Sequence, residues 1–258
     1  MKLSTGSSKL ALLLEQAHAL GASDVLLVAG AAPSAYVHSR LKPLANKPLT
    51  AEQTAALLKE IISPTQLQHL TAQRDLDLSI ALDGVGRCRV NVHFQRDSLA
   101  AAFRFIPNEI PALEALNLPP ILQDFARLPR GLVLVTGGTG HGKSTTMAAM
   151  VERINRDAAL HVITVEDPIE YEFAARQSII EQREIGLDSP SFASALRHVL
   201  RQKPDVIVIG EMRDLETIRI ALTAAETGHL VLGTLHTISA AQTIERVVDV
   251  FEPGQQPQ

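Results

Sequence analysis

Residues 137–144 read Gly137-Gly138-Thr139-Gly140-His141-Gly142-Lys143-Ser144, and Thr145 follows directly. This spacing is G-x-x-x-x-G-K-[ST], the pattern of a loop that binds the phosphates of a nucleotide. The apolar residues 132–136 in front of the loop predict a short buried strand, and apolar residues recur at helical spacing behind it. A strand, a glycine turn and a helix start form a nest of backbone N–H groups that attracts a di- or triphosphate. The chain is therefore predicted to bind a nucleotide.

The residues of this loop have separate expected roles. Lys143 is expected to contact the β- and γ-phosphates, and the Ser144 hydroxyl is expected to bind Mg²⁺. The other positions from Gly137 to Thr145 are expected to hold the phosphates through main-chain N–H groups. The alternative is a glycine-rich turn followed by an unrelated Lys-Ser pair, which does not account for the strand and helix on either side. The sequence contains no N-K-x-D motif of the kind that reads guanine, so a GTPase is not expected.

Composition and charge are those of a soluble globular protein. The 258 residues suffice for two domains, 46% are hydrophobic, and the formal net charge of −4 gives no reason to expect a nucleic-acid partner. Cys88 is the only cysteine, which excludes a disulfide framework and a Cys₄ zinc site. No apolar run approaches the roughly 18 residues that span a bilayer, and Glu15 interrupts the apolar start too early for a signal peptide. We therefore expect a cytoplasmic protein.

Hydropathy patterns divide the chain into two domains and a connecting segment. Residues 1–110 are predicted to form a small α+β domain with strands at 24–29, 35–39, 76–82, 87–95 and 99–106. Its predicted helices include 50–62, with Thr50 as N-cap and Gln53 in the capping-box position, and 64–73. Residues 111–130 are rich in proline and are predicted to be a linker or hinge with short helices. Residues 131–258 alternate strands and helices, which predicts a mostly parallel sheet with helices on both faces. Its strands are expected at 132–136, 161–165, 206–210 and 230–235, and two of its helices at 191–201 and 215–226.

Polar side chains follow three of these predicted strands. Glu170 lies in the acidic turn after the second strand, Glu211 follows the third, and His236 follows the fourth. Ligands of an open α/β sheet bind outside the carboxyl ends of the strands, so these groups are expected to converge with Lys143. Phosphoryl transfer needs such a combination, because cations neutralise charge and a carboxylate orients or deprotonates the attacking water. Glu170, Glu211 and His236 are therefore candidate catalytic residues.

Each of these candidates also has a plainer interpretation. Glu211 could be a solvated strand end, but beside a phosphate loop we assign it to catalysis and to Mg²⁺. The acidic residues 166–170 could cap the next segment. His229 and His236 flank the last predicted strand, and an isolated histidine is more often structural than catalytic. We assign His236 to catalysis because it lies at a carboxyl end, and His229 to nucleotide binding.

Four blocks of the sequence resemble the type II/IV secretion ATPases, and within that family the motors that retract type IV pili. The blocks are 131–150 around the phosphate loop, 163–170, 204–214 and 227–237. The resemblance implies a PAS-like N-terminal domain, a RecA-like C-terminal domain, and a homohexameric ring that hydrolyses ATP with Mg²⁺. It also implies that Glu211 acts on the attacking water and that Glu170 supports it.

The resemblance further implies that arginines of the first domain close over the nucleotide. The matching positions are Arg104, Arg96 and Arg89. On the sequence alone, these would be solvated strand residues. Arg104 lies between Phe103 and Phe105 in an alternating strand, so we expect its side chain to point away from the face that they share.

Three positions depart from the family pattern. His141 stands where a small residue is usual, Gly138 where proline is common, and Lys203 where the family is often acidic. Because the loop works through backbone N–H groups, a side chain at position 141 is tolerated if it faces outward. The family also extends past the position of Gln258 with a mostly helical segment that is characteristic of retraction motors.

Three functions stay open at this point. The leading one is a hexameric motor for pilus retraction, held at the inner membrane through a platform protein of the pilus or secretion machinery and bound to no nucleic acid. The second is a non-catalytic nucleotide-binding subunit that regulates or assembles the same machinery. The third is an assembly or secretion motor, whose relatives commonly carry a larger N-terminal region and a cysteine-rich zinc site.

Overall fold

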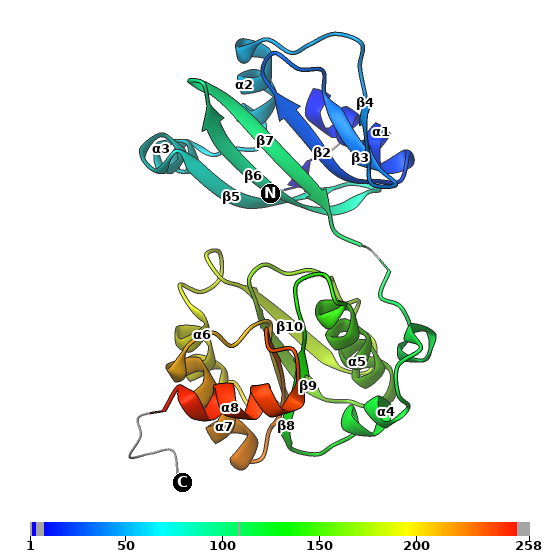
Figure 1. Ribbon diagram of the computed structural model, residues 1–258, viewed down its shortest axis with the longest axis vertical. Helices are drawn as coiled ribbons and strands as arrows, with labels where there is room; N and C mark the ends of the chain where they lie inside the picture. The colour runs from blue at the N-terminus through cyan, green and yellow to red at the C-terminus, as the bar shows by residue number, and fades with distance from the viewer. Residues whose placement is uncertain (1, 4–7, 108, 252–258) are drawn as a thin grey trace. The chain divides into compact units, whose positions relative to one another are not determined.

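The protein divides into two compact units. The computed structural model describes residues 2–3, 8–107 and 109–251, and the two units are Met1–Asn108 and Glu109–Gln258. Each unit has its own sheet and its own hydrophobic core (Figure 1).

The first unit is built on a seven-stranded sheet with the order β1-β5-β6-β7-β2-β3-β4. Neighbouring strands are antiparallel except for the parallel pair β1 and β5. The strands are β1 (Lys2–Leu3), β2 (Ala22–Val28), β3 (Ser34–Val37), β4 (Arg40–Pro43), β5 (Asp75–Leu82), β6 (Gly86–Gln95) and β7 (Ser98–Phe105). The sequence predicted five of these. Strand β1 was missed because it has only two residues, and β4 was missed because Arg-Leu-Lys-Pro is exposed throughout and shows no pattern of buried apolar positions.

Three helices complete the first unit: α1 (Lys9–Ala19), α2 (Ala51–Lys59) and α3 (Pro64–Gln73). Thr50 and Gln53 form the predicted capping box at the start of α2, which satisfies N–H groups that the helix leaves unbonded. Leu10 of α1 and Leu58 of α2 are fully buried in the core of this unit. Burial raises the pKa of the Cys88 thiol to about 12, so the lone cysteine is a core residue and not a nucleophile.

The second unit contains a five-stranded parallel sheet with the order β10-β9-β11-β12-β8. Its strands are β8 (Gly131–Thr136), β9 (His161–Glu166), β10 (Ile179–Glu184), β11 (Val206–Ile209) and β12 (Leu230–Leu235). Four of them match the predicted strands to within one residue at each end. The edge strand β10 was not predicted, because Ile-Ile-Glu-Gln-Arg-Glu carries no alternation of apolar and polar residues.

Helices cover both faces of this sheet, as the alternation of strands and helices predicted (Figure 1). Ile207 and Ile209 of β11 belong to the core that contains α6 and α7, whereas Val206 and Val208 belong to the core that contains α5. All four side chains are buried because both faces of the sheet are covered. The helices are the 3₁₀ helix η1 (Leu113–Leu116), α4 (Ile121–Phe125), α5 (Lys143–Asp157), α6 (Phe192–Val199), α7 (Leu215–Glu226) and α8 (Ala240–Asp249).

Residues 111–130, predicted as a linker or hinge, are packed into the second unit. Both η1 and α4 lie against α5, and Leu113 and Ala126 are buried in the same core as Met150 of α5. The linker prediction is therefore wrong for this part of the segment. Its prolines alternate with apolar residues that lie on short helices, and these residues bury their side chains against α5.

Candidate active site

The predicted phosphate loop lies between β8 and α5, at the carboxyl end of the parallel sheet. Gly137, Gly140 and Gly142 have φ angles of 149°, 78° and 80°, a region in which residues with a side chain are strained. Gly142 is the residue immediately before α5. The glycine spacing that defines the motif is thus required by the backbone that leads from the strand into the helix.

The start of α5 presents main-chain N–H groups to the loop. The first hydrogen bond of the helix runs from the N–H of Thr146 to the C=O of Gly142 at 2.9 Å. The N–H groups of Lys143, Ser144 and Thr145 therefore have no acceptor within the helix. These groups, together with the positive end of the helix dipole, attract an anion. The geometry fits the predicted binding of phosphates.

Two side chains fold back onto the loop. The ammonium Nζ of Lys143 donates to the carbonyl oxygens of Gly137 at 2.9 Å and Gly138 at 3.0 Å. The imidazole of His141 accepts the N–H of Gly138 on Nδ1 at 2.9 Å. His141 is exposed, and its ring lies over Gly138, whose missing side chain leaves space for it.

Glu211, just beyond the end of β11, is held by two side chains. Its Oε2 accepts a hydrogen bond from Nη2 of Arg213 at 2.6 Å, and its Oε1 lies 3.2 Å from Nε2 of His236, which follows β12. The hydrogen bond from Arg213 is the main reason that the pKa of Glu211 is lowered, and His236 contributes less. The structure therefore joins Glu211 to His236, as the positions after parallel strands predicted. Arg213 was missed, although its spacing of two residues puts it on the same side of an extended segment as Glu211.

Four parallel strands align these groups along one edge of the sheet. The strands β8, β12, β11 and β9 are neighbours in that order, and their carboxyl ends are in register at the pairs Leu235–Thr136 and Ile209–Val165. Neighbouring strands lie about 4.8 Å apart, so about 10 Å separates the end of β8, which leads to Lys143, from the end of β11, which leads to Glu211. The loop of Lys143 and the segment of Glu211 therefore lie along the same edge of the sheet.

The last residue of β9, Glu166, is a second carboxylate at this edge, to which the sequence assigned no catalytic role. Glu166 accepts hydrogen bonds from Oγ1 of Thr164 at 2.6 Å and from Nε2 of Gln182 at 3.2 Å. Burial is the main cause that raises the pKa of Glu166. Glu170 is exposed, and its N–H donates to Oε2 of Glu166 at 3.4 Å. Glu166 lies at the same edge of the sheet as Glu170, so it joins Glu170 as a candidate; the catalytic role of Glu170 stays a prediction.

A hydroxyl pair links the same turn to α5. Oγ1 of Thr145 lies 3.0 Å from the phenol oxygen of Tyr171, the residue after Glu170. This contact holds the turn that carries Glu170 beside the first turn of α5, where the phosphates are expected. Tyr171 was not predicted as a site residue, since its only signal was its position next to the acidic turn.

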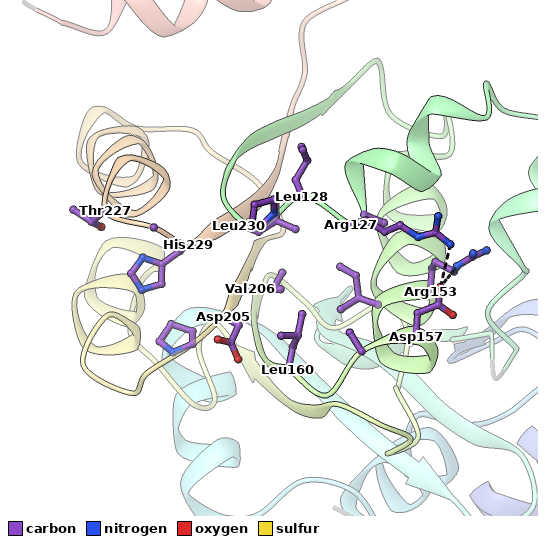
Figure 2. Close-up of a pocket in the computed structure, with 16 residues that line it drawn as sticks. Arg127, Leu128, Arg153, Asp157, Leu160, Asp205, Val206, Thr227, His229 and Leu230 are labelled. Atoms are coloured by element: carbon purple, nitrogen blue, oxygen red, sulfur yellow. Dashed lines mark hydrogen bonds and ion pairs between the residues drawn. The ribbon is translucent and has the colours of Figure 1, made fainter.

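His229 lies at the opposite edge of the sheet from the phosphate loop. It precedes β12, and its Nδ1 lies 3.0 Å from the carbonyl oxygen of Ala224 in α7. Figure 2 shows His229 among the residues around a pocket of about 600 Å³, together with Leu160 and Val206 at the amino ends of neighbouring strands. Strand β12 has six residues at about 3.3 Å each, so roughly 20 Å separates His229 from the loop edge. His229 is therefore too far away to contact a nucleotide bound to the phosphate loop of its own chain, and the prediction is wrong for that nucleotide.

Of the three arginines that the resemblance pointed to in the first unit, Arg104 and Arg96 lie at different ends of β7, and Arg89 of β6 pairs in register with Arg104. Nε of Arg104 donates to Oδ1 of Asp24 at 2.8 Å, and its side chain is 70% exposed while Phe103 is fully buried. The predicted alternation is therefore confirmed. Arg96 lies in the turn between β6 and β7 with a φ of 45°, and roughly 20 Å of strand separates that turn from Arg104. The roles of both arginines at the nucleotide stay predictions.

No group of three His, Cys, Asp or Glu side chains suited to a metal ion occurs within residues 2–3, 8–107 and 109–251. Mg²⁺ at phosphate sites needs only one or two protein ligands, because water and phosphate oxygens supply the others. None of the helices in the described part of the chain has the length and apolar character that a membrane crossing requires.

Comparison with known proteins gives a consistent set of relatives. A family model described as type II/IV secretion system protein matches residues 114–253. The type IV pilus retraction ATPase PilT of Pseudomonas aeruginosa is 47% identical over 231 residues, which cover 90% of this chain and 67% of the relative. A twitching motility protein of Neisseria gonorrhoeae is 46% identical over 228 residues, which cover 88% of this chain and 61% of the relative. The chain thus spans about two thirds of the length of these relatives.

A solved structure supports the same relationship. The crystal structure of the pilus retraction motor PilT with bound ADP matches with a TM-score of 0.92 and 50% identity, over 96% of this chain and 73% of that chain. This match confirms the predicted α/β fold, in which an N-terminal domain is followed by a RecA-like ATPase domain.

Proposed function

Because this chain belongs to the family of type II/IV secretion system proteins, we propose that it is an ATP-hydrolysing motor that powers the retraction of a type IV pilus. The observation that carries the proposal is the pairing of Glu211 with His236 and Arg213 on the sheet edge that also carries the loop of Lys143. Relatives named for pilus retraction and twitching motility match about nine tenths of the chain.

The site divides the chemistry between the loop and the neighbouring strand ends. The N–H groups at the start of α5 and the ammonium of Lys143 bind the β- and γ-phosphates. The carboxylate of Glu211 orients the attacking water and accepts its proton. Arg213 and His236 hold the two oxygens of Glu211 at 2.6 and 3.2 Å and favour the ionised form that this role needs.

A magnesium ion fits the same edge. Ser144 lies in the first turn of α5, and Glu211, the carboxylate that the sequence assigned to the metal, follows β11 at the same edge of the sheet. Both are hard oxygen donors of the type that Mg²⁺ prefers. When bound, the ion neutralises the charge that builds up on the phosphate oxygens.

The alternatives are less well supported. A non-catalytic regulatory subunit has no need of an ionised carboxylate beside the phosphates, yet Glu211 is present with a lowered pKa. An assembly or secretion motor shares the ATP chemistry, but the matches to proteins named for retraction and twitching extend over both units. We therefore favour the retraction motor.

Assembly and location follow from the family resemblance as further parts of the proposal. The motor acts as a homohexamer in the cytoplasm, on the inner face of the inner membrane. It is held there through a platform protein of the pilus or secretion machinery. Arg104 and Arg96 close over the nucleotide, from the same subunit or from a neighbour.

Lys143→Ala tests the assigned site. The ammonium that Lys143 places against the carbonyls of Gly137 and Gly138 is lost, so hydrolysis of ATP is expected to stop, measured as phosphate release by the purified chain. Lys59→Ala, which changes an exposed lysine at the end of α2, is the matched control and should retain activity. If Lys143→Ala hydrolysed ATP at the wild-type rate, the assignment of this loop as the ATP site would be refuted.

A second experiment tests the retraction role. The wild-type chain should restore twitching in a bacterium whose own retraction motor is deleted, and Lys143→Ala should not. ATP hydrolysis without restored twitching would keep the ATPase assignment and refute the role in retraction.

A further inference from the structure

The phosphate loop contains a bonded pair of residues that the motif itself does not require. The N–H of Gly138 donates to Nδ1 of His141 at 2.9 Å, and the N–H of His141 donates to the carbonyl oxygen of Gly138 at 3.3 Å. Two hydrogen bonds therefore join the same two residues, one through the main chain and one through the imidazole. The motif would allow any residue at either position.

The imidazole also fills the space beside Gly138. A Cβ atom on Gly138 would lie 3.0 Å from Cε1 and 3.1 Å from Nδ1 of the ring. Gly138 is not among the glycines with positive φ, unlike Gly137, Gly140 and Gly142. Glycine is therefore required at position 138 because the ring of His141 occupies the space of a side chain, and not because of the backbone conformation.

Lys143 rests on the same residue. Its ammonium donates to the carbonyl oxygens of Gly138 at 3.0 Å and Gly137 at 2.9 Å. Gly138 is thus held through its N–H by His141 and through its C=O by Lys143 and His141. The position of Gly138 sets where the lysine lies, and the imidazole sets the position of Gly138.

From this geometry we propose that His141 is a positioning residue for phosphate binding, whose imidazole braces the loop in the conformation that receives the nucleotide. The inference rests on the proposed nucleotide-binding function of the loop. With Nδ1 as the acceptor, the neutral ring carries its proton on Nε2. If the loop is already ordered before the nucleotide binds, binding does not have to supply the free energy of ordering it. The hydrogen bond from Gly138 to His141 should therefore lower the Kd for the nucleotide.

The first test removes the acceptor and then restores it. His141→Ala should raise the Kd of a fluorescent ADP analogue about fivefold, or about 1 kcal/mol, the usual contribution of one hydrogen bond. His141→Asn should recover most of the affinity, because Asn Oδ1 and His Nδ1 are both acceptors attached to Cγ. His198→Ala, which changes an exposed histidine of α6, is the matched control, and thermal unfolding checks that each variant is folded.

The second test uses the contact between the ring and Gly138. Gly138→Ala should raise the Kd about tenfold, or about 1.4 kcal/mol, because the new Cβ would lie 3.0 Å from the imidazole and overpacking of this kind costs a comparable free energy. Adding His141→Ala removes the collision, so the double variant should bind more tightly than Gly138→Ala alone. A merely structural role for each residue would make the two losses add.

The outcomes separate this inference from the proposed function. A wild-type Kd in His141→Ala, a His141→Asn variant no better than alanine, or additive losses in the double variant would each overturn the brace and leave the ATPase assignment intact. Failure of the wild-type chain to bind the ADP analogue would overturn both.

Discussion

Replacement of Glu211 by glutamine separates catalysis from folding at the proposed site. The amide keeps the size of the side chain but removes its negative charge. In the wild type the carboxylate oxygens lie 2.6 Å from Nη2 of Arg213 and 3.2 Å from Nε2 of His236. The amide cannot accept the proton of the attacking water. Loss of a group that acts in the transition state lowers kcat by about 10²–10³, or about 2.7–4 kcal/mol. We expect a loss of this size for Glu211→Gln.

Folding should change far less than catalysis. The Glu211 side chain is 20% exposed, and those of Arg213 and His236 are 65% and 44% exposed. Ion pairs with this much solvent around them contribute about 0–1 kcal/mol to folding. A loss of 1 kcal/mol lowers Tm by about 2–4 °C in a domain of this size. The expected result is therefore a large fall in kcat with a shift in Tm of a few degrees at most.

Phosphate release at saturating ATP, binding of an ADP analogue and thermal unfolding should be measured on the same preparation. Glu181→Gln is the matched control, because Glu181 also pairs with a histidine, His161, at 3.0 Å, but nearer the amino ends of β9 and β10. It should hydrolyse ATP at the wild-type rate. A kcat for Glu211→Gln within about tenfold of wild type, or a collapse of Tm that explains the loss of activity, would refute the assignment.

Two further predictions concern pH and stability. Arg213 lowers the pKa of Glu211, so the carboxylate stays charged to a lower pH than an ordinary glutamate. Arg213→Ala should raise that pKa and move the acid limb of the pH–kcat profile to higher pH; a limb that stays in place or moves down contradicts this. Asn155 is fully buried in α5, where its Nδ2 donates to the C=O of Ala174 at 2.8 Å and its Oδ1 accepts the N–H of Arg176 at 3.3 Å. Asn155→Ala leaves both main-chain groups without that partner, so it should destabilise the protein by about 2 kcal/mol and lower Tm by about 4–8 °C in thermal unfolding. An unchanged Tm would show that the hydrogen bonds of Asn155 to Ala174 and Arg176 contribute nothing to stability.

Local patterns were enough to locate most of the elements and the phosphate loop. The helices α3 and α7 have the predicted bounds, because caps and helical spacing act over a few residues. The capping box of Thr50 was also readable from four residues. Strand β10 could not be predicted in this way, since its conformation depends on pairing with β9 and not on a pattern of its own.

Whether a residue precedes or follows a parallel strand predicts the edge of the sheet at which it lies. Because parallel strands place all their carboxyl ends at one edge, Glu211 and His236 were expected to meet, and they do. The same reasoning puts His229, which precedes β12, at the other edge. Its assignment to the nucleotide ignored the direction of the strand.

The sequence by itself determined the two-unit α/β architecture, the phosphate loop, and the strand ends that lie beside it. Only the tertiary structure decided which carboxylates have shifted pKa values and which cations hold them. Burial raises the pKa of Glu166, which accepts a hydrogen bond from Gln182, sixteen residues away, and Glu211 is paired with a histidine that follows the next strand. Arg213 is only two residues from Glu211, but the burial of Glu166 depends on neighbours that the fold brings together across the sheet, and no short stretch of sequence records it.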